Sequence, residues 1–387
     1  MARLKDVCTI NPKSPGFQDD FAVSFVPMPK VGENGEFDPS EVKTYQEVKK
    51  GFTYFQDGDV LFAKITPCME NGKGAIAQAL KNGIGFGSTE FHVLRPLTDR
   101  VTSKWLYYLL SWQVFRKEAE KNMTGSAGQK RVPKSFLSEY VADISDVNTQ
   151  KKMTDTLDKI CDLISLRKQQ LAKLDELVKA RFVEMFDTCE DTVRLSDVAD
   201  ITGGLTKNSK RNKLNLKLPY LRVANVSFAS IDVSEMLEIG LTEAERDKTI
   251  LKYGDLLFVE GNGSPDQIGR VAIWRDEIIP CVHQNHLIKA RIDHSKILPV
   301  FTMYYFMSQR GREQIKSKAV STSGLYTLST SKIAGFRLPA PPMVLQKQFA
   351  SFVEQTDKSK LTIQQSLDKL EVLKKSLMQE YFGFEQV

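Results

Sequence analysis

Few residues of this chain have types and spacing that could carry chemistry. The segment "CVHQNH" brings Cys281, His283 and His286 close together, and cysteine and histidine are preferred ligands of zinc. On a strand, however, Cys281 and His283 would share one face while His286 would point to the other. No fourth ligand is evident either. Histidines of a core or of a binding surface explain the segment better, so we predict no metal site.

The motifs of nucleotide-dependent and nucleophilic enzymes are absent. "NGKGAIA", from Asn71, lacks the spacing and the Lys-Ser/Thr end of a phosphate-binding loop. "GNGSPDQIG", from Gly261, has Asp266 where a dinucleotide fingerprint needs its third glycine. The sequence contains no C-x-x-C, no G-x-S-x-G and no Asn/Asp-Pro-Pro-aromatic motif of an amino-methyltransferase. We therefore predict that the chain is not an enzyme.

Basic and amide side chains gather instead in loops. "TKNSKRNKLNLK", Thr206 to Lys217, holds five Lys or Arg residues and three Asn residues. Cations contact phosphates, and amides can pair with adenine edges, so the segment has the composition of a nucleic-acid contact. A solvated, charged face is the simpler alternative. The candidates within this segment are Lys207, Asn208, Lys210, Arg211 and Lys213.

Other polar loops offer further candidates for the same contact. They lie in "KITPCMENGKG" from Lys64, "GQKR" from Gly128, "NGSPDQIGR" from Asn262 and "HQNH" from His283, with one aromatic residue beyond them. The candidate residues are Lys64, Thr66, Lys73, Gln129, Lys130, Arg131, Asn262, Gln267, Arg270, Gln284, Asn285 and Tyr326.

The chain contains one unit twice. A shift of 196 residues places "GDVLF" (58–62) on "GDLLF" (254–258) and aligns two long helical segments without gaps. Near the start, a shift of 191 matches "ARLKDVCTI" (2–10) with "VRLSDVADI" (193–201). A repeat of this length predicts two similar domains, each followed by a helix. The predicted boundaries are 1–148, 149–190, 191–344 and 345–387.

The globular parts have a mixed α/β pattern. Short runs rich in Val, Ile, Phe and Tyr, such as "YLRVANVSF" (220–228) and "RVAIW" (270–274), predict strands. Each copy then has an aromatic-rich amphipathic segment, from Ser103 and from Leu298, that we expect to form one helix. A loop of small residues follows each of these helices, at 124–132 and 322–330.

The two long helices carry apolar stripes at three-four spacing, which is typical of a coiled-coil seam. Packing of each helix on its own domain is the alternative to packing of the pair. Connectivity and pseudosymmetry predict that the helices are antiparallel and that Val387 lies near Met1. The predicted seam residues are Leu157, Ile160, Ile164, Leu171, Leu174, Val178, Ile363, Leu367, Leu370, Leu373 and Leu377, with Leu163, Leu166, Leu177 and Phe182 widening the stripe.

A proline-rich segment, "RLPAPPMVLQKQF" (337–349), precedes the second long helix. Proline fixes φ and excludes helix, so we expect a stiff, extended strut that forms a spacer together with the helix. The first copy, "YVADISDVNTQ" (140–150), keeps the glutamine, Gln150, that matches Gln346, but it has no proline.

Composition limits the remaining possibilities. The 387 residues are 41% hydrophobic and 26% charged, as in an ordinary globular protein, and no run suggests a membrane span or a signal peptide. Five scattered cysteines favour a reducing cytoplasm over a disulfide framework. Residues 1–191 hold 27 basic and 27 acidic side chains, whereas 192–387 hold 27 and 21, so the net charge of +6 lies in the second copy. This excess suggests a polyanionic partner.

Taken in order, the duplicated motifs resemble those of the specificity subunit of type I restriction-modification systems. The shared features are R-L-x-D-V, G-D-hydrophobic-L-F, a small-residue loop, and a Pro-rich segment with Gln leading into a long helix. The likeness covers essentially the full chain. It implies two target-recognition domains separated by two antiparallel coiled-coil helices.

The resemblance also implies a function. Each domain would read one half of a split target in double-stranded DNA, and the helices would set the gap between the halves. The helices would also dock modification subunits, two per chain, which methylate adenine using S-adenosylmethionine. Restriction subunits that need ATP and Mg²⁺ would join through them, and this chain would hold no cofactor. Two alternatives are a coiled-coil scaffold that binds only protein, and an enzyme such as a nuclease or a single-chain methyltransferase.

Overall fold

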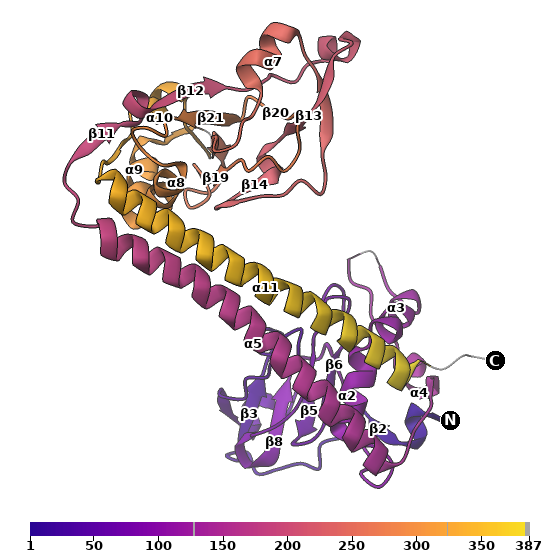
Figure 1. The fold of residues 1–387 in the computed structure, drawn as a ribbon. Coiled ribbons are helices and arrows are strands. Elements are labelled where there is room, and N and C mark those ends of the chain that lie inside the picture. The colour runs from indigo at the N-terminus through magenta and orange to yellow at the C-terminus, as the bar shows by residue number, and fades with distance from the viewer. Residues whose placement is uncertain (127, 323, 384–387) are drawn as a thin grey trace. The chain divides into compact units, whose positions relative to one another are not determined.

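The computed structural model of the chain describes residues 1–126, 128–322 and 324–383 (Figure 1). The chain forms two compact units of mixed helix and sheet. Unit 1 comprises Met1–Lys168 together with the chain from Gln365 onward, and unit 2 comprises Gln169–Gln364. Each long helix is therefore shared between the two units. Val387, which we predicted to lie near Met1, is outside the described residues.

Unit 1 contains two four-stranded sheets, with strand orders β2-β9-β6-β7 and β4-β3-β8-β5, and a small pair, β1-β10. The first sheet is antiparallel throughout, and helices α2 and α3 pack on it through the core that contains Phe62 and Phe115. The strands are β1 Ala2–Arg3, β2 Cys8–Ile10, β3 Ala22–Val26, β4 Val42–Thr44, β5 Thr53–Gln56, β6 Val60–Ala63, β7 Gly74–Ile76, β8 Ile84–Gly87, β9 Phe91–Pro96 and β10 Val141–Ala142. The helices, apart from the long ones, are α1 Tyr45–Val48, α2 Ser103–Ser111, α3 Gln113–Lys121 and α4 Lys134–Glu139.

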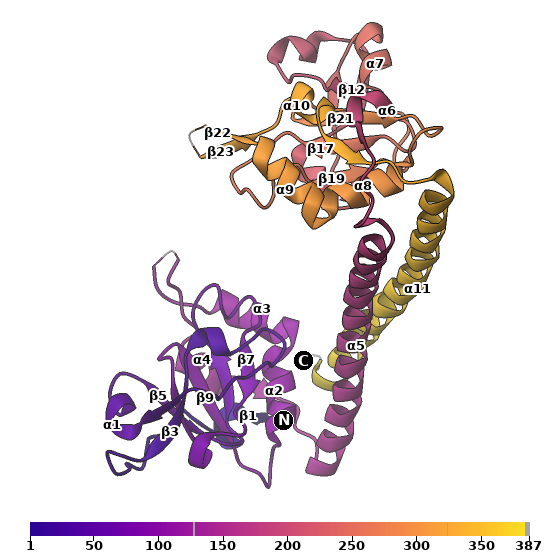
Figure 2. The same ribbon diagram turned by 90° about the vertical axis from the view of Figure 1, so that its left-hand side faces the viewer.

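Unit 2 repeats this plan with a four-stranded antiparallel sheet, β12-β21-β17-β19, beside smaller sheets (Figure 2). In Figure 2 the hairpin β22–β23 projects from unit 2 on the side opposite α11. The strands are β11 Thr192–Arg194, β12 Ala199–Gly203, β13 Lys217–Leu221, β14 Val226–Ser227, β15 Ser230–Ile231, β16 Leu237–Gly240, β17 Leu256–Val259, β18 Gly261–Asn262, β19 Val271–Ile273, β20 Val282–His283, β21 Leu287–Ile292, β22 Val320–Thr322, β23 Leu325–Thr327 and β24 Arg337–Pro339. Its shorter helices are α6 Leu195–Val198, α7 Glu243–Thr249, α8 Pro299–Met307, α9 Gln309–Lys318 and α10 Thr330–Ala334.

The repeated Gly-Asp motif is a structural element. Its glycine has a positive φ, +88° at Gly58 and +90° at Gly254, which a residue without a side chain adopts readily. The following aspartate is buried and binds an arginine on the neighbouring strand through two hydrogen bonds. Asp59 binds Arg95 at 2.8 Å twice, and Asp255 binds its partner Arg291 at 2.8 and 2.7 Å. The pair fixes β6 against β9, and β17 against β21.

The prediction of one helix after each sheet was wrong, because both segments break in the middle. Trp112 separates α2 from α3 with ψ of 130°, and Ser308 separates α8 from α9 with ψ of 163°. The Ser308 hydroxyl then caps α9 by accepting a hydrogen bond from the Gly311 backbone N–H at 3.3 Å. In unit 1 apolar side chains continue through the break, from Leu110 to Trp112 and Phe115, so the hydrophobic pattern did not reveal it. In unit 2 the apolar run ends at Met307 and resumes only at Ile315.

The long helices are α5, Val147–Phe186, and α11, Met343–Phe382, and they are antiparallel within each unit. In unit 1, Leu157 shares a core with Phe382, and Lys168 pairs with Glu371 at 3.3 Å. In unit 2, Asp175 pairs with Lys360, and the ring centroids of Phe182 and Phe349 lie 5.3 Å apart. In each unit, higher numbers in α5 meet lower numbers in α11, as the repeat predicts.

The seam is narrower than the apolar stripe. The buried seam residues are Leu157, Ile160, Val178 and Leu367, and the half-buried ones are Ile164, Leu171, Leu174, Ile363, Leu370 and Leu377. Leu163, Leu166, Leu177 and Leu373 are 42–49% exposed, so the expectation that they are covered within the chain was wrong. Two helices that meet along one line bury only the side chains closest to that line.

The proline segment is not a free strut, which corrects the expectation of a separate spacer element. Residues Arg337–Pro339 form β24, which pairs with β11, and the Ala340 N–H donates to the Asp191 carbonyl at 2.9 Å. In unit 1, β10 pairs with β1 in the same way without prolines. Pairing with the domain, rather than proline content, therefore holds this segment in both copies.

Two equivalent glutamines connect each long helix to its unit. Gln346 is buried; its Oε1 accepts from the Leu298 N–H at 2.8 Å and its Nε2 donates to the Pro341 carbonyl at 2.8 Å. Gln150 makes the same bond to the Thr102 N–H and donates to two carbonyls. Each glutamine satisfies buried backbone groups at a helix start, which explains why this residue type recurs.

We expect Gln346→Leu to lower the free energy of unfolding by about 2–4 kcal/mol, because it leaves a buried N–H and a buried carbonyl without partners. Urea unfolding of the full chain, followed by circular dichroism, measures this change. Gln355→Leu, an exposed position on the same helix, serves as the control. Equal effects of the two substitutions would contradict the assigned role.

Candidate nucleic-acid interface

Sheet topology brings the predicted polar loops of each unit to one edge. In unit 1, antiparallel neighbours β2, β9 and β6 place the end of β2, the start of β9 and the end of β6 together. In unit 2, β12, β21 and β17 do the same. We call this side of each sheet, with the segments that leave it, the loop edge.

In unit 1, backbone hydrogen bonds join three segments at the loop edge. The Lys64 N–H donates to the Glu90 carbonyl at 2.9 Å, which ties the end of β6 to the start of β9. A hairpin closed by Thr124 and Arg131 then adds to the same edge, because the Thr66 N–H donates to the Lys130 carbonyl at 3.1 Å. Lys64, Thr66, Gln129, Lys130 and Arg131 are therefore brought together, although more than fifty residues separate the two groups in sequence.

Unit 2 has the same connections at positions shifted by 196. The Glu260 N–H donates to the His286 carbonyl at 2.9 Å, and β18 pairs with β23, placing Asn262 opposite Tyr326. The Leu205 N–H donates to the His283 carbonyl at 2.9 Å, so the segment after β12 also starts here. Gln284 and Asn285 lie between these contacts.

The Lys-rich segment leaves the loop edge towards α7. Lys207, Asn208, Lys210 and Lys213 are exposed, and the Asn208 side chain caps the short 3-10 helix Ser209–Lys213. Arg211 differs from them. Its guanidinium binds both carboxylate oxygens of Glu245, at 3.1 and 2.8 Å, and donates to two backbone carbonyls, one of them that of Gly240. Arg211 thus holds in place the segment that carries the exposed lysines.

The remaining candidates divide into engaged and open side chains. Arg131 makes two hydrogen bonds to Glu90, at 2.9 and 2.8 Å, and this guanidinium lowers the pKa of Glu90. Further internal hydrogen bonds engage Thr66, Lys73, Asn262 and Arg270 with neighbouring loop groups, while Gln267 accepts from Arg270. Among the described residues, no side-chain hydrogen bond holds Gln129, Lys130, Gln284 or Asn285.

Comparison with known proteins then assigns the family. The sequence pattern described as the type I restriction modification DNA specificity domain matches residues 1–176 and again 189–374. The chain belongs to this specificity-domain family. The double match corresponds to the internal repeat.

Two curated members of the family, both from Escherichia coli, are similar to this chain. The EcoEI type I specificity subunit is 38% identical over 211 residues, and the EcoAI subunit 39% over 204. Each match covers 51% of this chain but only 35% and 34% of those relatives' own lengths.

Solved structures support the fold of this specificity-domain protein over its whole length. A chain from a structure titled for assembly and conformational transition of the type I R-M system has a TM-score of 0.64 and 15% identity, covering 99% of this chain and 97% of that one. The S subunit from M. genitalium has a TM-score of 0.56 and 14% identity, covering 100% and 96%. At these identities, the likeness concerns the fold alone.

Two other features of the specificity-domain protein bear on its chemistry. His283 is fully buried, with Nδ1 at 2.9 Å from the Leu287 carbonyl, and burial lowers its pKa to about 4. His286 instead faces Glu260, and no cluster of three metal-binding side chains occurs in the part of the chain that the structure describes. The described helices likewise include none long and apolar enough to cross a bilayer.

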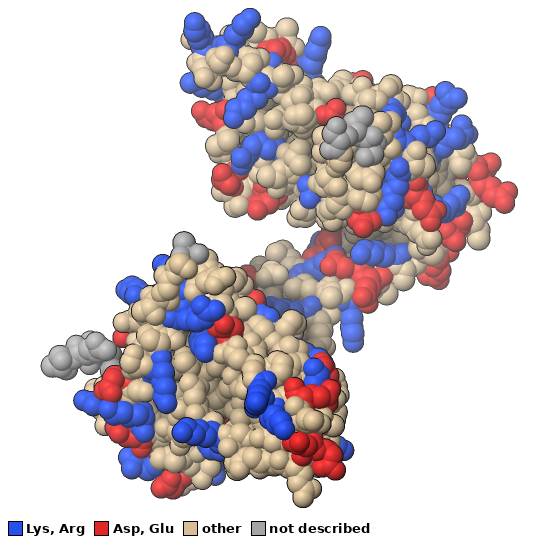
Figure 3. All heavy atoms as spheres, turned by 180° about the vertical axis from the view of Figure 1, so that it is seen from behind, with Lys and Arg blue, Asp and Glu red and all other residues tan. Residues whose placement is uncertain are grey.

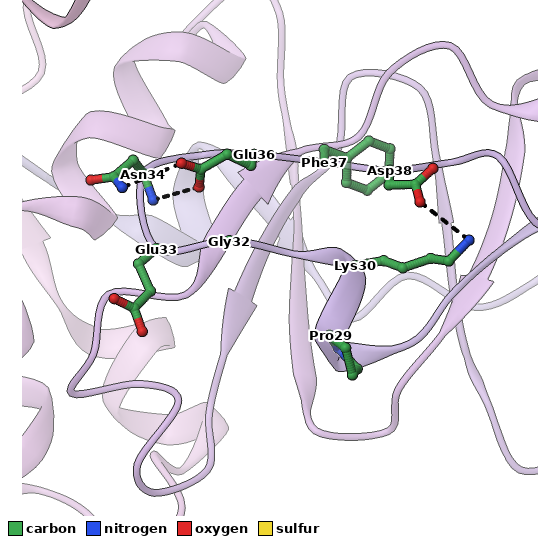
Figure 4. A pocket seen from close by; sticks show the side chains of 8 residues that line it. All are labelled: Pro29, Lys30, Gly32, Glu33, Asn34, Glu36, Phe37 and Asp38. Carbon is green, nitrogen blue, oxygen red and sulfur yellow. Dashed lines mark hydrogen bonds and ion pairs between the residues drawn. The ribbon is translucent and has the colours of Figure 1, made fainter. Parts of the chain in front are cut away.

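A shallow hollow of about 550 Å³ lies in unit 1 beside the loop that follows β6 (Figure 4). Three carboxylates, Glu33, Glu36 and Asp38, line it, and the Lys30 ammonium lies 3.3 Å from Asp38. This acidic lining does not suit a phosphate. Basic side chains gather elsewhere, including the end of unit 2 that carries α7 (Figure 3).

The sequence did not single out several residues that build the loop edge. Glu90 and His286 occupy equivalent places, as do Lys64 and Glu260, so the two edges carry different charges on one backbone frame. Two arginines that bind loop carbonyls, Arg116 on α3 and Arg312 on α9, were also missed. The shift of 196 residues would have paired these positions, had it been applied to the polar residues as well as to the motifs.

We expect Arg211→Ala to lower the free energy of unfolding by about 1–3 kcal/mol, because it removes hydrogen bonds to a carboxylate and to two carbonyls. The Arg211 guanidinium lowers the pKa of Glu245 from 4.5 to about 2. The contribution of the pair is therefore complete above pH 4.5 and is lost as pH falls towards 2.

The stability difference between wild type and Glu245→Gln should accordingly shrink as pH is lowered through this window. Urea midpoints at a series of pH values measure it, with Lys210→Ala as a control that leaves the pair intact. A difference that does not change with pH would exclude the ion pair as its source.

Proposed function

We propose that this chain is a non-catalytic specificity subunit of a type I restriction-modification complex, and that each unit reads half of a split target in double-stranded DNA. The observation that carries this proposal is the duplicated loop edge, where amides and cations from distant segments converge on a rigid sheet. Phosphate contacts by exposed lysines would position the DNA. Amides such as those of Gln284 and Asn285 would read base edges.

The partners follow from the same proposal. Two modification subunits would dock on the helices, one for each pseudo-equivalent unit, and would supply S-adenosylmethionine-dependent methylation of adenine. Restriction subunits would join through them and use ATP and Mg²⁺. This chain would hold none of these cofactors, and the complex would act in the cytoplasm.

The leucines of α5 and α11 that remain exposed support docking on the helices. In unit 1, Leu163, Leu166 and Leu373 are 42–47% exposed on helices that already pack together. Apolar side chains arranged in this way along a helix pair suit additional helices from a partner. The proposal therefore gives the helix pair two roles, as ruler and as docking site.

The protein-only scaffold and the enzyme make different predictions. A scaffold would show no salt-dependent affinity for duplex DNA, whereas phosphate contacts lose affinity steeply as salt rises. An enzyme would methylate or cut DNA as the purified chain alone, without modification or restriction subunits. Both assays use the full chain.

Lys210→Ala with Lys213→Ala should weaken binding to duplex DNA regardless of its sequence. Each lost phosphate contact should reduce the slope of log affinity against log salt by about one. Fluorescence anisotropy across a salt series measures both effects. Arg211 stays in place, so that the segment keeps its fold.

Lys347→Ala with Lys369→Ala is the matched control, because it removes the same charge from exposed positions on α11. If the two double variants had equal slopes of log affinity against log salt, the Lys-rich segment would be only a solvated surface and not a DNA contact.

The spacing role is tested by lengthening both helices together. A copy of 171–177 inserted before Leu171 and a copy of 364–370 inserted before Gln364 add one heptad to each. The insertions lie between Lys168 and Asp175 in α5, and between Lys360 and Glu371 in α11, so neither ion pair is disrupted. Seven residues preserve the seam and add about 10 Å.

Since ten base pairs of DNA span about 34 Å, the preferred gap between half-sites should grow by roughly one to three base pairs. The range allows for DNA twist and bending. The test measures methylation, by the reconstituted complex, of a library of DNA duplexes that differ in the gap between half-sites. Unchanged half-site sequences are expected, and an unchanged gap with full activity would show that the helices are not the ruler.

A further inference from the structure

Both units contain an arginine at the same place, and it is buried in unit 1 but half-buried in unit 2. Arg116 on α3 and Arg312 on α9 are 196 residues apart and occupy matching positions in the two copies. Among the described residues, neither guanidinium forms an ion pair. Removing a cation even partly from water without a counter-ion is costly, so other contacts must hold each guanidinium.

In unit 2, Arg312 binds the backbone of the loop that follows β17. Its guanidinium donates to the carbonyls of Ile268 at 2.7 Å, Asp266 at 3.2 Å and Gly269 at 3.3 Å. It also lies over the Phe228 ring, 5.1 Å from the centroid. These three hydrogen bonds from one guanidinium therefore tie this loop to α9.

In unit 1, Arg116 makes the corresponding contact with the loop after β6. It donates to the Met69 carbonyl at 2.6 Å and lies over the Phe62 ring at 5.2 Å. Its Nε has no partner among the described residues, and burial lowers its pKa to about 10. One carbonyl and one ring face hold this guanidinium, fewer contacts than in unit 2.

The bound loops are those that present candidate DNA contacts. The loop of unit 2 runs from Asn262 through Gln267 to Arg270, and that of unit 1 from Lys64 through Thr66 to Lys73. A second tether supports the unit 2 loop, since Lys316 on α9 pairs with Asp266 at 2.6 Å. Gly269 is so close to Ile315 that an added Cβ would lie 2.7 Å from it.

We propose that Arg312 and Arg116 are positioning residues that lock the recognition loops to α9 and α3, so that each unit discriminates its own half-site. The inference rests on the proposed function. Base readout requires donors and acceptors held in a fixed geometry, and a loop without its carbonyl tethers would sample several conformations. Phosphate attraction, which tolerates such movement, would persist.

Arg312→Met keeps length and apolar packing over Phe228 but removes every donor. We expect it to reduce discrimination against single-base changes in one half-site about tenfold, comparable to the loss of one bidentate base contact. Discrimination in the other half-site and the salt slope on non-target duplex should be unchanged. Arg116→Met should give the mirror result, and Arg312→Lys should restore part of the loss.

The measurement uses the full chain with its modification subunits and duplexes carrying the target selected by the wild type. Lys318→Ala, an exposed position on α9, is the control. If Arg312→Met does not fold, Lys316→Ala removes only the exposed tether to Asp266 and should produce a smaller loss in the same half-site.

An equal loss in both half-sites, or no loss in either, would overturn the positioning role while leaving the proposed function intact. Absence of any discrimination by the wild type would instead overturn the proposed function, and the positioning role with it.

Discussion

In each unit, the antiparallel pairing of two central strands determines where the polar loops lie. β6 pairs with β9 in unit 1, and β17 with β21 in unit 2, in a register that places residue 64 beside 90 and residue 260 beside 286. At the opposite end of each strand pair, a buried aspartate bound to a half-buried arginine holds this register. A slip of one residue would turn the side chains to the other face of the sheet and separate the loops.

On this repeated frame the two units carry different polar groups. Unit 1 has Lys64 with Glu90 at its loop edge, and unit 2 has Glu260 with His286. The Lys-rich segment after β12 has no counterpart of similar charge in unit 1, which explains why the excess positive charge lies in the second copy. Identical frames with different surfaces support the proposal that the two units read different half-sites.

The helices serve both units and are stabilised by both. Each unit contains part of α5 and part of α11, and the buried glutamines fix each helix start to its own domain. The seam buries a single line of side chains and leaves neighbouring leucines exposed. A helix pair that is held by its domains but not fully covered leaves apolar side chains on which further helices can pack.

The sequence alone determined the duplication, the two long antiparallel helices and the mixed α/β class, since repeated motifs and apolar periodicity record which faces are buried. It also located the polar loops. Only the tertiary structure showed that Thr66 meets Lys130, that Arg211 binds Glu245 rather than solvent, and that both aromatic helices break. The partners in these hydrogen bonds lie far apart in sequence, so the local sequence pattern does not identify them. The sheet register determines which of these side chains and backbone groups meet.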